Sequence, residues 1–156
     1  MDYGLAGQAV IVTGASKGIG KAIAHAFLRE GANVTMTARN ERELRHAASE
    51  DGGTGTAIAV AGDVTDAKHR DEVVRTTVER FGSVDVLVNN AGGIGAFAAF
   101  EDLRLEDWRD LFELNLFSVV ALTQLVLPVM REKRFGRIIN ISSESAVQPD
   151  AAMPHY

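Results

Sequence analysis

Short apolar runs alternate with longer amphipathic stretches along this chain. The runs are rich in β-branched residues and recur at near-regular intervals, which predicts five strands at residues 10–13, 33–37, 56–61, 84–88 and 137–141. The stretches between them have the length and apolar spacing of helices. Alternating β and α units of this length predict right-handed crossovers and a parallel sheet with helices on both faces. The predicted fold class is therefore α/β, with a doubly wound sheet.

Apolar residues at spacings of three and four predict where the helices lie. The first helix, over residues 18–29, is predicted to place four residues on one face: Ile19, Ile23, Ala26 and Phe27. Asn40 and Asp66 stand where the next two helices begin and are predicted to be their N-caps. A glycine-containing loop at residues 92–97 precedes a long helix, predicted from about Leu105 to Met130.

The composition is that of an ordinary soluble α/β protein, and its 156 residues fit a single domain over residues 1–156. A net charge of −5 predicts no general attraction to nucleic acid or to an anionic membrane. The absence of cysteine fits a reducing compartment, and the N-terminus lacks the features of a signal peptide. The longest apolar stretch, residues 116–130, falls short of the ~20 residues of a membrane span. These features predict a cytoplasmic protein without a membrane anchor.

The four histidines show no metal-ligand spacing, so the sequence predicts no metal site. We interpret all four as surface residues, namely His25, His46, His69 and His155. The aromatic residues at helical spacing near residue 110 are predicted to pack rather than to stack on bases.

The first predicted strand passes directly into a glycine turn and then into a helix. Gly14, Gly18 and Gly20 would let backbone amides approach a diphosphate, and the helix N-terminus adds partial positive charge there. This favours a dinucleotide site, although a tight turn without a ligand has a similar pattern. A Walker loop fails twice, because Ala15 and Ala22 replace required residues. A hydrolase nucleophile elbow centred on Ser16 stays an alternative, although only about a dozen residues precede it.

The residue type at the end of the second strand selects between the two nicotinamide cofactors. An acidic residue about 20 positions after the glycine loop would bind a ribose 2′-hydroxyl. Here that position carries Arg39, and Lys17 projects from the glycine loop. Both cations suit a 2′-phosphate, for which arginine offers a planar fork of donors. The sequence therefore favours NADP over NAD.

Taken in order, five segments of the chain resemble the short-chain dehydrogenase/reductase family. They are Thr13–Gly20, Asp63–Val64, Asn89–Gly92, Asn115 with its neighbours, and the pair Ser143 and Tyr156. The resemblance covers the whole chain and implies a Rossmann fold with an NADP-dependent oxidoreductase activity on a carbonyl or secondary alcohol. It also implies a small-molecule substrate and, because family members are often dimers or tetramers, a homo-oligomer.

The resemblance assigns roles to particular residues. Tyr156 would be the general acid/base that exchanges a proton with the substrate oxygen, Ser143 would polarise that oxygen, and Asn115 would hold a water in a proton relay. The cofactor would be bound by twelve residues: Gly14, Ser16, Lys17, Gly18, Ile19, Gly20, Arg39, Asp63, Val64, Asn90, Ala91 and Gly92.

The chain departs from the family pattern at its end, because the family places a lysine four residues after its tyrosine and this sequence stops at Tyr156. A cation beside a phenol lowers its pKa, so the 156-residue chain alone is expected to be inactive. The last strand would be an exposed edge, and one apolar side of the long helix would be uncovered. We therefore expect an N-terminal portion of a longer reductase whose C-terminal strands are missing. The alternative is a non-catalytic nucleotide-binding or regulatory module.

Overall fold

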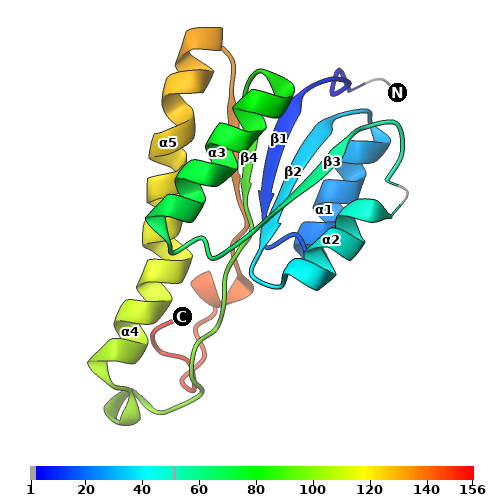
Figure 1. The fold of residues 1–156 in the computed structure, drawn as a ribbon. Coiled ribbons are helices and arrows are strands. Elements are labelled where there is room, and N and C mark those ends of the chain that lie inside the picture. Colours follow the sequence, from blue (N-terminus) through cyan, green and yellow to red (C-terminus); the bar gives the residue numbers. More distant parts are fainter. Residues whose placement is uncertain (1–2, 51) are drawn as a thin grey trace.

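The computed structural model describes residues 3–50 and 52–156 and contains one five-stranded parallel sheet (Figure 1). The strands are β1 (Ala9–Thr13), β2 (Asn33–Ala38), β3 (Ala57–Ala61), β4 (Val86–Asn89) and β5 (Arg137–Asn140). Their order across the sheet is β3-β2-β1-β4-β5, with every neighbouring pair parallel. The predicted doubly wound fold is confirmed. The connection from β3 through α3 to β4 takes the chain from one half of the sheet to the other, so the strand order reverses between β1 and β4.

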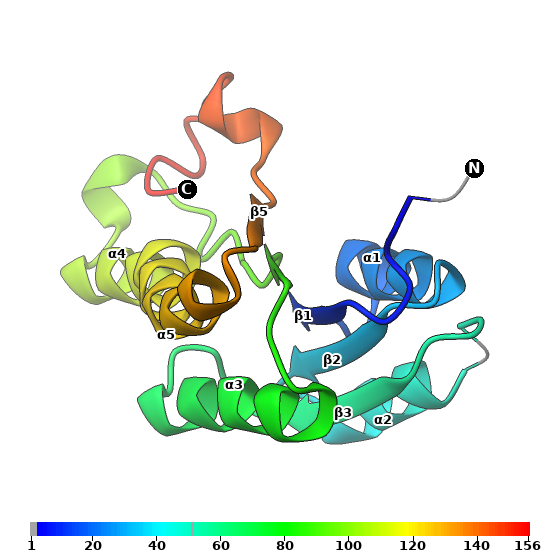
Figure 2. The same ribbon diagram turned by 90° about the horizontal axis from the view of Figure 1, so that it is seen from above.

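Helices cover both faces of the sheet (Figure 2). The α-helices are α1 (Gly18–Arg29), α2 (Glu41–Ser49), α3 (Ala67–Phe81), α4 (Leu105–Phe112) and α5 (Ser118–Lys133). A π-helical turn, η2 (Glu113–Phe117), joins α4 to α5, and short 3-10 turns lie at η1 (Phe100–Asp102) and η3 (Glu144–Ala146). Helices α1 and α2 lie on one face, and α3 and α5 lie on the other.

Each face of the sheet has its own apolar cluster. Val10 and Val12 of β1 pack with α1 and α2, whereas Ile11 between them packs with α3 and α5. This division follows from the alternation of side chains along a strand. Because helices cover both faces, β1 is buried along its whole length, and its end is held rigidly where the glycine turn begins.

The predicted buried face of α1 is wrong by about one residue. The helix buries Gly20, Ala24 and Leu28 at a spacing of four, whereas Ile19 is 64% exposed. Ala26 is exposed as well, although Ile23 and Phe27 are partly buried. Gly20 is buried because the first turn of α1 lies so close to the Gly14 backbone and to Asn90 that no side chain fits there.

Two of the four histidines predicted at the surface are buried. His69 is 6% exposed, and its Nε2 lies 2.7 Å from the Thr37 hydroxyl. His155 is 5% exposed and packs on Trp108 with ring centroids 5.7 Å apart. His69 follows Lys68 and His155 follows a turn-rich segment, so the local pattern did not mark either of them as buried. His46 is exposed and His25 is half-buried.

The long helix extends further than predicted. Helical backbone runs without interruption from Leu105 to Lys133, through the π-helical turn. By length and composition this 29-residue stretch could cross a membrane, with a mean hydropathy of 1.6 over its most apolar window, so the length argument against a span was wrong. The core helix of a soluble protein, which is mostly buried, passes the same test; here 17% of the window is buried, and α5 packs on α3 and on β4.

Strand β5 is an edge of the sheet, as predicted. It pairs with β4 on one side, and all four of its residues are exposed. Ile138 and Ile139 keep 37% and 40% of their surface accessible. The outer side of α4, η2 and α5 is also apolar and exposed, at Phe112, Leu116, Phe117 and Val120.

Candidate functional site

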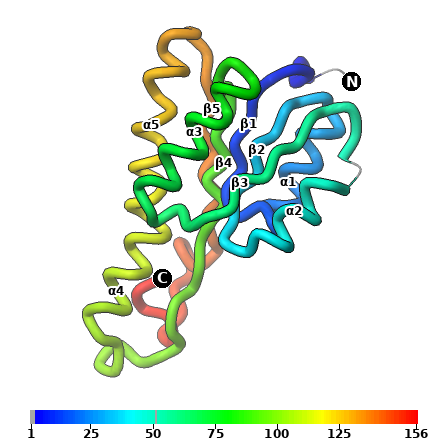
Figure 3. Tube along the Cα trace, viewed as in Figure 1, coloured from blue at the N-terminus to red at the C-terminus, as the bar shows by residue number. Residues whose placement is uncertain are grey.

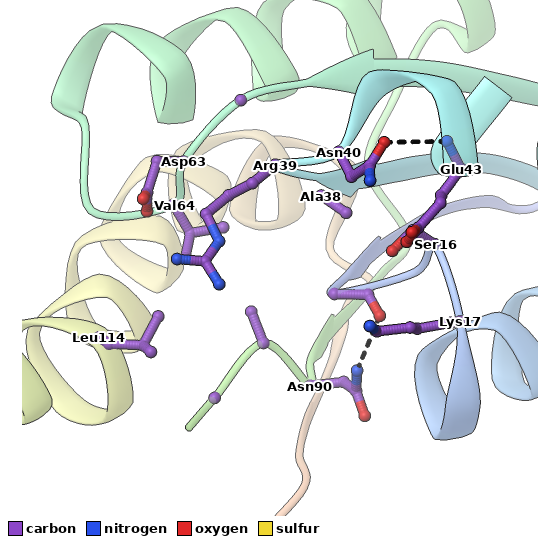
Figure 4. Close-up of a pocket in the computed structure, with 14 residues that line it drawn as sticks. Ser16, Lys17, Ala38, Arg39, Asn40, Glu43, Asp63, Val64, Asn90 and Leu114 are labelled. Carbon is purple, nitrogen blue, oxygen red and sulfur yellow. Dashed lines mark hydrogen bonds between the residues drawn. The ribbon is translucent and has the colours of Figure 1, made fainter. Parts of the chain in front are cut away.

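A cavity of about 320 Å³ lies beyond the carboxyl ends of β1, β2, β3 and β4 (Figure 4). In an open parallel sheet this edge collects the loops that follow the strands, and the change of direction between β1 and β4 leaves a crevice there. The cavity is lined by Gly14, Ser16, Lys17, Ala38, Arg39, Asn40, Glu43, Gly62, Asp63, Val64, Asn90, Ala91, Gly92 and Leu114.

The N-terminus of α1 faces this cavity without a side-chain cap. Lys17 is the N-cap residue, and its side chain makes no capping hydrogen bond. In contrast, Asn40 Oδ1 accepts from the Glu43 amide at 3.1 Å, and Asp66 Oδ1 accepts from the Lys68 amide at 2.9 Å, so both predicted caps are confirmed. The first amides of a helix need an acceptor, and an anion supplies one. Helix α1 is thus suited to hold a phosphate group.

Two glycines of the loop occupy positions that exclude a side chain. Gly14 has φ +66°, and a Cβ placed there would lie 2.9 Å from Asn90 Nδ2. A Cβ on Gly20 would lie 2.4 Å from both Asn90 Nδ2 and the Gly14 carbonyl oxygen. The loop after β1 and the loop after β4 therefore touch through backbone and a carboxamide. This contact fixes the two walls of the cavity relative to each other.

Thr13, the last residue of β1, ties these loops together and is a site residue that sequence reasoning missed. Its side chain is buried, and the hydroxyl accepts from the Asn90 and Ala91 amides, both at 2.9 Å. The same hydroxyl donates to the Val88 carbonyl at 3.3 Å. Asn90 Nδ2 in turn donates to the Thr13 carbonyl at 2.9 Å. Only the structure brings these residues, 77 positions apart, together.

Charged residues from different strands meet in the cavity. Figure 4 shows the Arg39 side chain directed toward Asp63 and Val64. Burial alone would raise the pKa of the Asp63 carboxyl, but hydrogen bonds from the Thr65 amide and hydroxyl, together with the charge of Arg39, hold that pKa below its usual value. Asp63 is therefore a carboxylate at neutral pH.

Nine of the twelve predicted cofactor residues line the cavity, and three do not. Gly20 lies beneath the wall that Gly14 and Asn90 form, Gly18 has a left-handed backbone with φ +56°, and the Ile19 side chain is exposed. Five lining residues were not predicted: Ala38, Asn40, Glu43, Gly62 and Leu114. These residues stand at or near the ends of β2 and β3 or in a helical turn, which indicates a place near the site. The sequence did not show which of them face the cavity.

Asn115 lies in the π-helical turn and holds the loop after β4. Its Oδ1 accepts from the Gly93 amide at 3.0 Å, and its Nδ2 donates to the Gly93 carbonyl at 2.8 Å. π-helical turns place one extra residue in a helix and often lie at functional sites. The side chain predicted to hold a water thus engages the backbone next to Gly92.

Ser143 and Tyr156 lie outside the cavity lining, in the segment that follows β5. This segment returns to the carboxyl-end side of the sheet and ends beside α4 (Figure 3). The Ser143 hydroxyl accepts from the Ser145 amide at 3.2 Å, and the Tyr156 side chain is 37% exposed. Within residues 3–50 and 52–156, no hydrogen bond joins Ser143 to Tyr156 or to Asn115.

The family model of the short chain dehydrogenases matches residues 8–156. The chain belongs to this family. The match decides between the two interpretations of the glycine turn. Residues 14–20 lie within the matched dehydrogenase region, so the turn is not the nucleophile elbow of a hydrolase centred on Ser16. It also explains why the cavity lies at the carboxyl ends of the first four strands, where members of an α/β class bind their ligands.

Relatives of the chain include enzymes and solved structures with either cofactor. The 3-oxoacyl-(acyl-carrier-protein) reductase of Vibrio cholerae is 38% identical over 152 residues, which cover 97% of this chain and 61% of that protein. The structure of L-sorbose reductase from Gluconobacter frateurii with NADPH and L-sorbose has a TM-score of 0.94 at 37% identity, and the match covers 100% of this chain and 60% of that one. A 7α-hydroxysteroid dehydrogenase structure with NADH has a TM-score of 0.92, also at 37% identity, over 97% and 59% of the two chains. This chain therefore spans about 60% of the length of these relatives.

Proposed function

We propose that this chain is the cofactor-binding portion of an NADP-dependent oxidoreductase that transfers a hydride between NADP(H) and a carbonyl or secondary alcohol. The observation that carries the proposal is the cavity itself, where the uncapped N-terminus of α1 meets two cations, Lys17 and Arg39. The α1 amides would hold the diphosphate. Arg39 and Lys17 would pair with the 2′-phosphate, and Asp63 and Val64 would flank the adenine.

The nicotinamide cofactor supplies or accepts the hydride when it is bound. The chain's own residues would handle the proton. Tyr156 would exchange a proton with the substrate oxygen, Ser143 would donate a hydrogen bond to that oxygen, and Asn115 would hold the loop at Gly93 that leads to the nicotinamide side. Asn90, Ala91 and Gly92 would line that side of the cavity.

We propose that the 156 residues form one dinucleotide-binding domain and that turnover requires the remainder of the longer family proteins. About 40% of the length of the relatives that match here lies outside the part aligned with this chain. The exposed edge of β5 and the apolar side of α4, η2 and α5 would be covered in a homo-oligomeric protein that includes this remainder. The proposed location is the cytoplasm.

Cofactor titration tests the binding half of the proposal. We expect NADPH to bind more tightly than NADH, and Arg39→Ala to weaken NADPH binding by about tenfold, the equivalent of ~1.4 kcal/mol, with little effect on NADH. Arg42→Ala is the matched control, because Arg42 lies three residues further on, in the first turns of α2, and is outside the cavity lining. Binding of neither cofactor would refute the proposal.

A steady-state assay tests the chemical half. The chain alone, and the chain fused to the C-terminal segment of the Vibrio relative, would be supplied with NADPH and a panel of carbonyl compounds. We expect NADPH oxidation by the fusion only, and its loss in the Tyr156→Phe variant of the fusion. A fusion that binds NADPH but oxidises none of it with any carbonyl would instead favour a non-catalytic nucleotide-binding module.

A further inference from the structure

The charges that line the cavity cancel. Its ionisable lining residues are two cations, Lys17 and Arg39, and two carboxylates, Glu43 and Asp63. A pocket that strongly selected a doubly charged phosphate would carry a net positive charge. The two carboxylates therefore decide how far the two cations can favour one cofactor over the other.

The two carboxylates differ in their hydrogen-bond and ion-pair partners. Asp63 accepts two hydrogen bonds from Thr65, at 3.0 and 2.9 Å, and faces Arg39, so its charge is compensated within the protein. Glu43 is held only through its backbone amide, which donates to Asn40. Among the ion pairs of the described residues, none involves the Glu43 carboxylate. In Figure 4 this side chain extends from α2 toward Ser16 in the glycine loop.

The position of Glu43 matches the one place where the two nicotinamide cofactors differ. The ribose 2′ substituent is bound at the end of the second strand of such a sheet, opposite the glycine loop. Glu43 lies in the first turn of α2, immediately after β2, where the helix N-terminus favours its negative charge. A carboxylate can accept a hydrogen bond from a 2′-hydroxyl, whereas it repels a 2′-phosphate.

We propose that Glu43 is a specificity-determining residue that opposes Arg39 and Lys17 and lets the site accept NAD as well as NADP. The proposal rests on the proposed function and refines it. With Glu43 present, the preference for NADP is reduced because the phosphate binds beside an uncompensated carboxylate. The ribose hydroxyl of NAD gains an acceptor at the same position.

The test compares two carboxylates in the same helical turn. Glu43→Gln removes the charge that faces the cavity, and Glu41→Gln removes one that is outside the cavity lining and pairs with Arg45 at 2.7 Å. Dissociation constants for NADPH and NADH would be measured by titration calorimetry with both variants and the wild type. We expect Glu43→Gln to tighten NADPH binding about five- to tenfold and to weaken NADH binding about twofold, with the Glu41→Gln ratio within about twofold of the wild-type ratio.

Salt and a second variant separate this mechanism from a structural effect. The gain in NADPH affinity should shrink at an ionic strength of about 0.5 M, where charges are screened over a few ångströms. Glu43→Ala should change the ratio of the NADPH and NADH dissociation constants in the same direction as Glu43→Gln. Thermal unfolding of both variants would show whether either one has a folding defect. An unchanged ratio in both Glu43 variants, or a gain that persists in high salt, would overturn the proposal for Glu43 while leaving the cofactor site intact. Binding of neither cofactor by the wild type would overturn both proposals.

Discussion

Replacing Thr13 by valine should destabilise the protein far more than its single lost hydroxyl suggests. Valine has nearly the same shape, so the change creates no cavity, but it removes the acceptor used by the Asn90 and Ala91 amides. Each buried amide left without an acceptor costs about 1–3 kcal/mol, and the residues here are half-buried, so water can compensate in part. We expect a loss of about 2–3 kcal/mol in the free energy of unfolding.

Thermal and urea unfolding measure this loss directly. For a chain of this size, about 2–3 kcal/mol corresponds to a fall in Tm of roughly 5–10 °C. Thr13→Ser is the matched control, because it keeps the hydroxyl and should stay within about 1 kcal/mol of the wild type. Thr13→Val should also weaken NADPH binding more than tenfold, since the loop of residues 90–92 loses its anchor. The reasoning would be refuted by a valine variant within ~0.5 kcal/mol of the wild type, or by a serine variant that is equally destabilised.

Three further perturbations follow from the packing. Gly20→Ala should abolish measurable NADPH binding, because its Cβ would lie 2.4 Å from the Gly14 carbonyl oxygen. Gly18→Ala has open space around it and should lower the free energy of unfolding by about 1–2 kcal/mol, because the backbone there is left-handed. Cofactor titration and thermal unfolding check both variants. Burial holds the pKa of His69 below 6.5, so the free energy of unfolding should be fully retained above about pH 6.5 and fall as the pH drops below it, and His69→Gln should remove that slope in urea titrations between about pH 5 and 7. Lys133→Met should cost about 2–4 kcal/mol, measured by urea unfolding, because it leaves the buried Asp85 without its cation.

The strands and the order of elements could be predicted because each depends on local pattern. All five strands fall within two residues of their predicted bounds, and both side-chain N-caps stand where the sequence placed them. Apolar runs and capping residues act over a few positions, so one sequence suffices to find them. The buried face of α1 could not be predicted in this way, since Gly20 occupies its position for lack of room rather than for hydrophobicity.

The candidate site could be predicted as a place but not as a set of contacts. Strand ends located Gly14, Arg39, Asp63 and Asn90 at one edge of the sheet, and the cavity is lined by all four. Thr13 was missed because its partners are 77 and 78 positions away, and its hydroxyl looks like any other at the end of a strand. His155 was misplaced because it follows a turn-rich segment, and only the packing on Trp108 shows that it is buried.

The residues that were hardest to predict are those whose role depends on whether their side chain faces the cavity or the solvent. Glu41 and Glu43 are both glutamates in the first turn of α2, yet one pairs with Arg45 in solvent and the other lines the cavity. A rotation of about 200° between positions two apart in a helix separates them, and the rotation is set by Leu44, which the core buries completely. The charge that the cofactor would meet is therefore fixed by the apolar packing of the neighbouring residue, which lies about 100° further around the helix. It follows that a substitution at Leu44 that rotated α2 would change cofactor preference without altering any residue of the cavity.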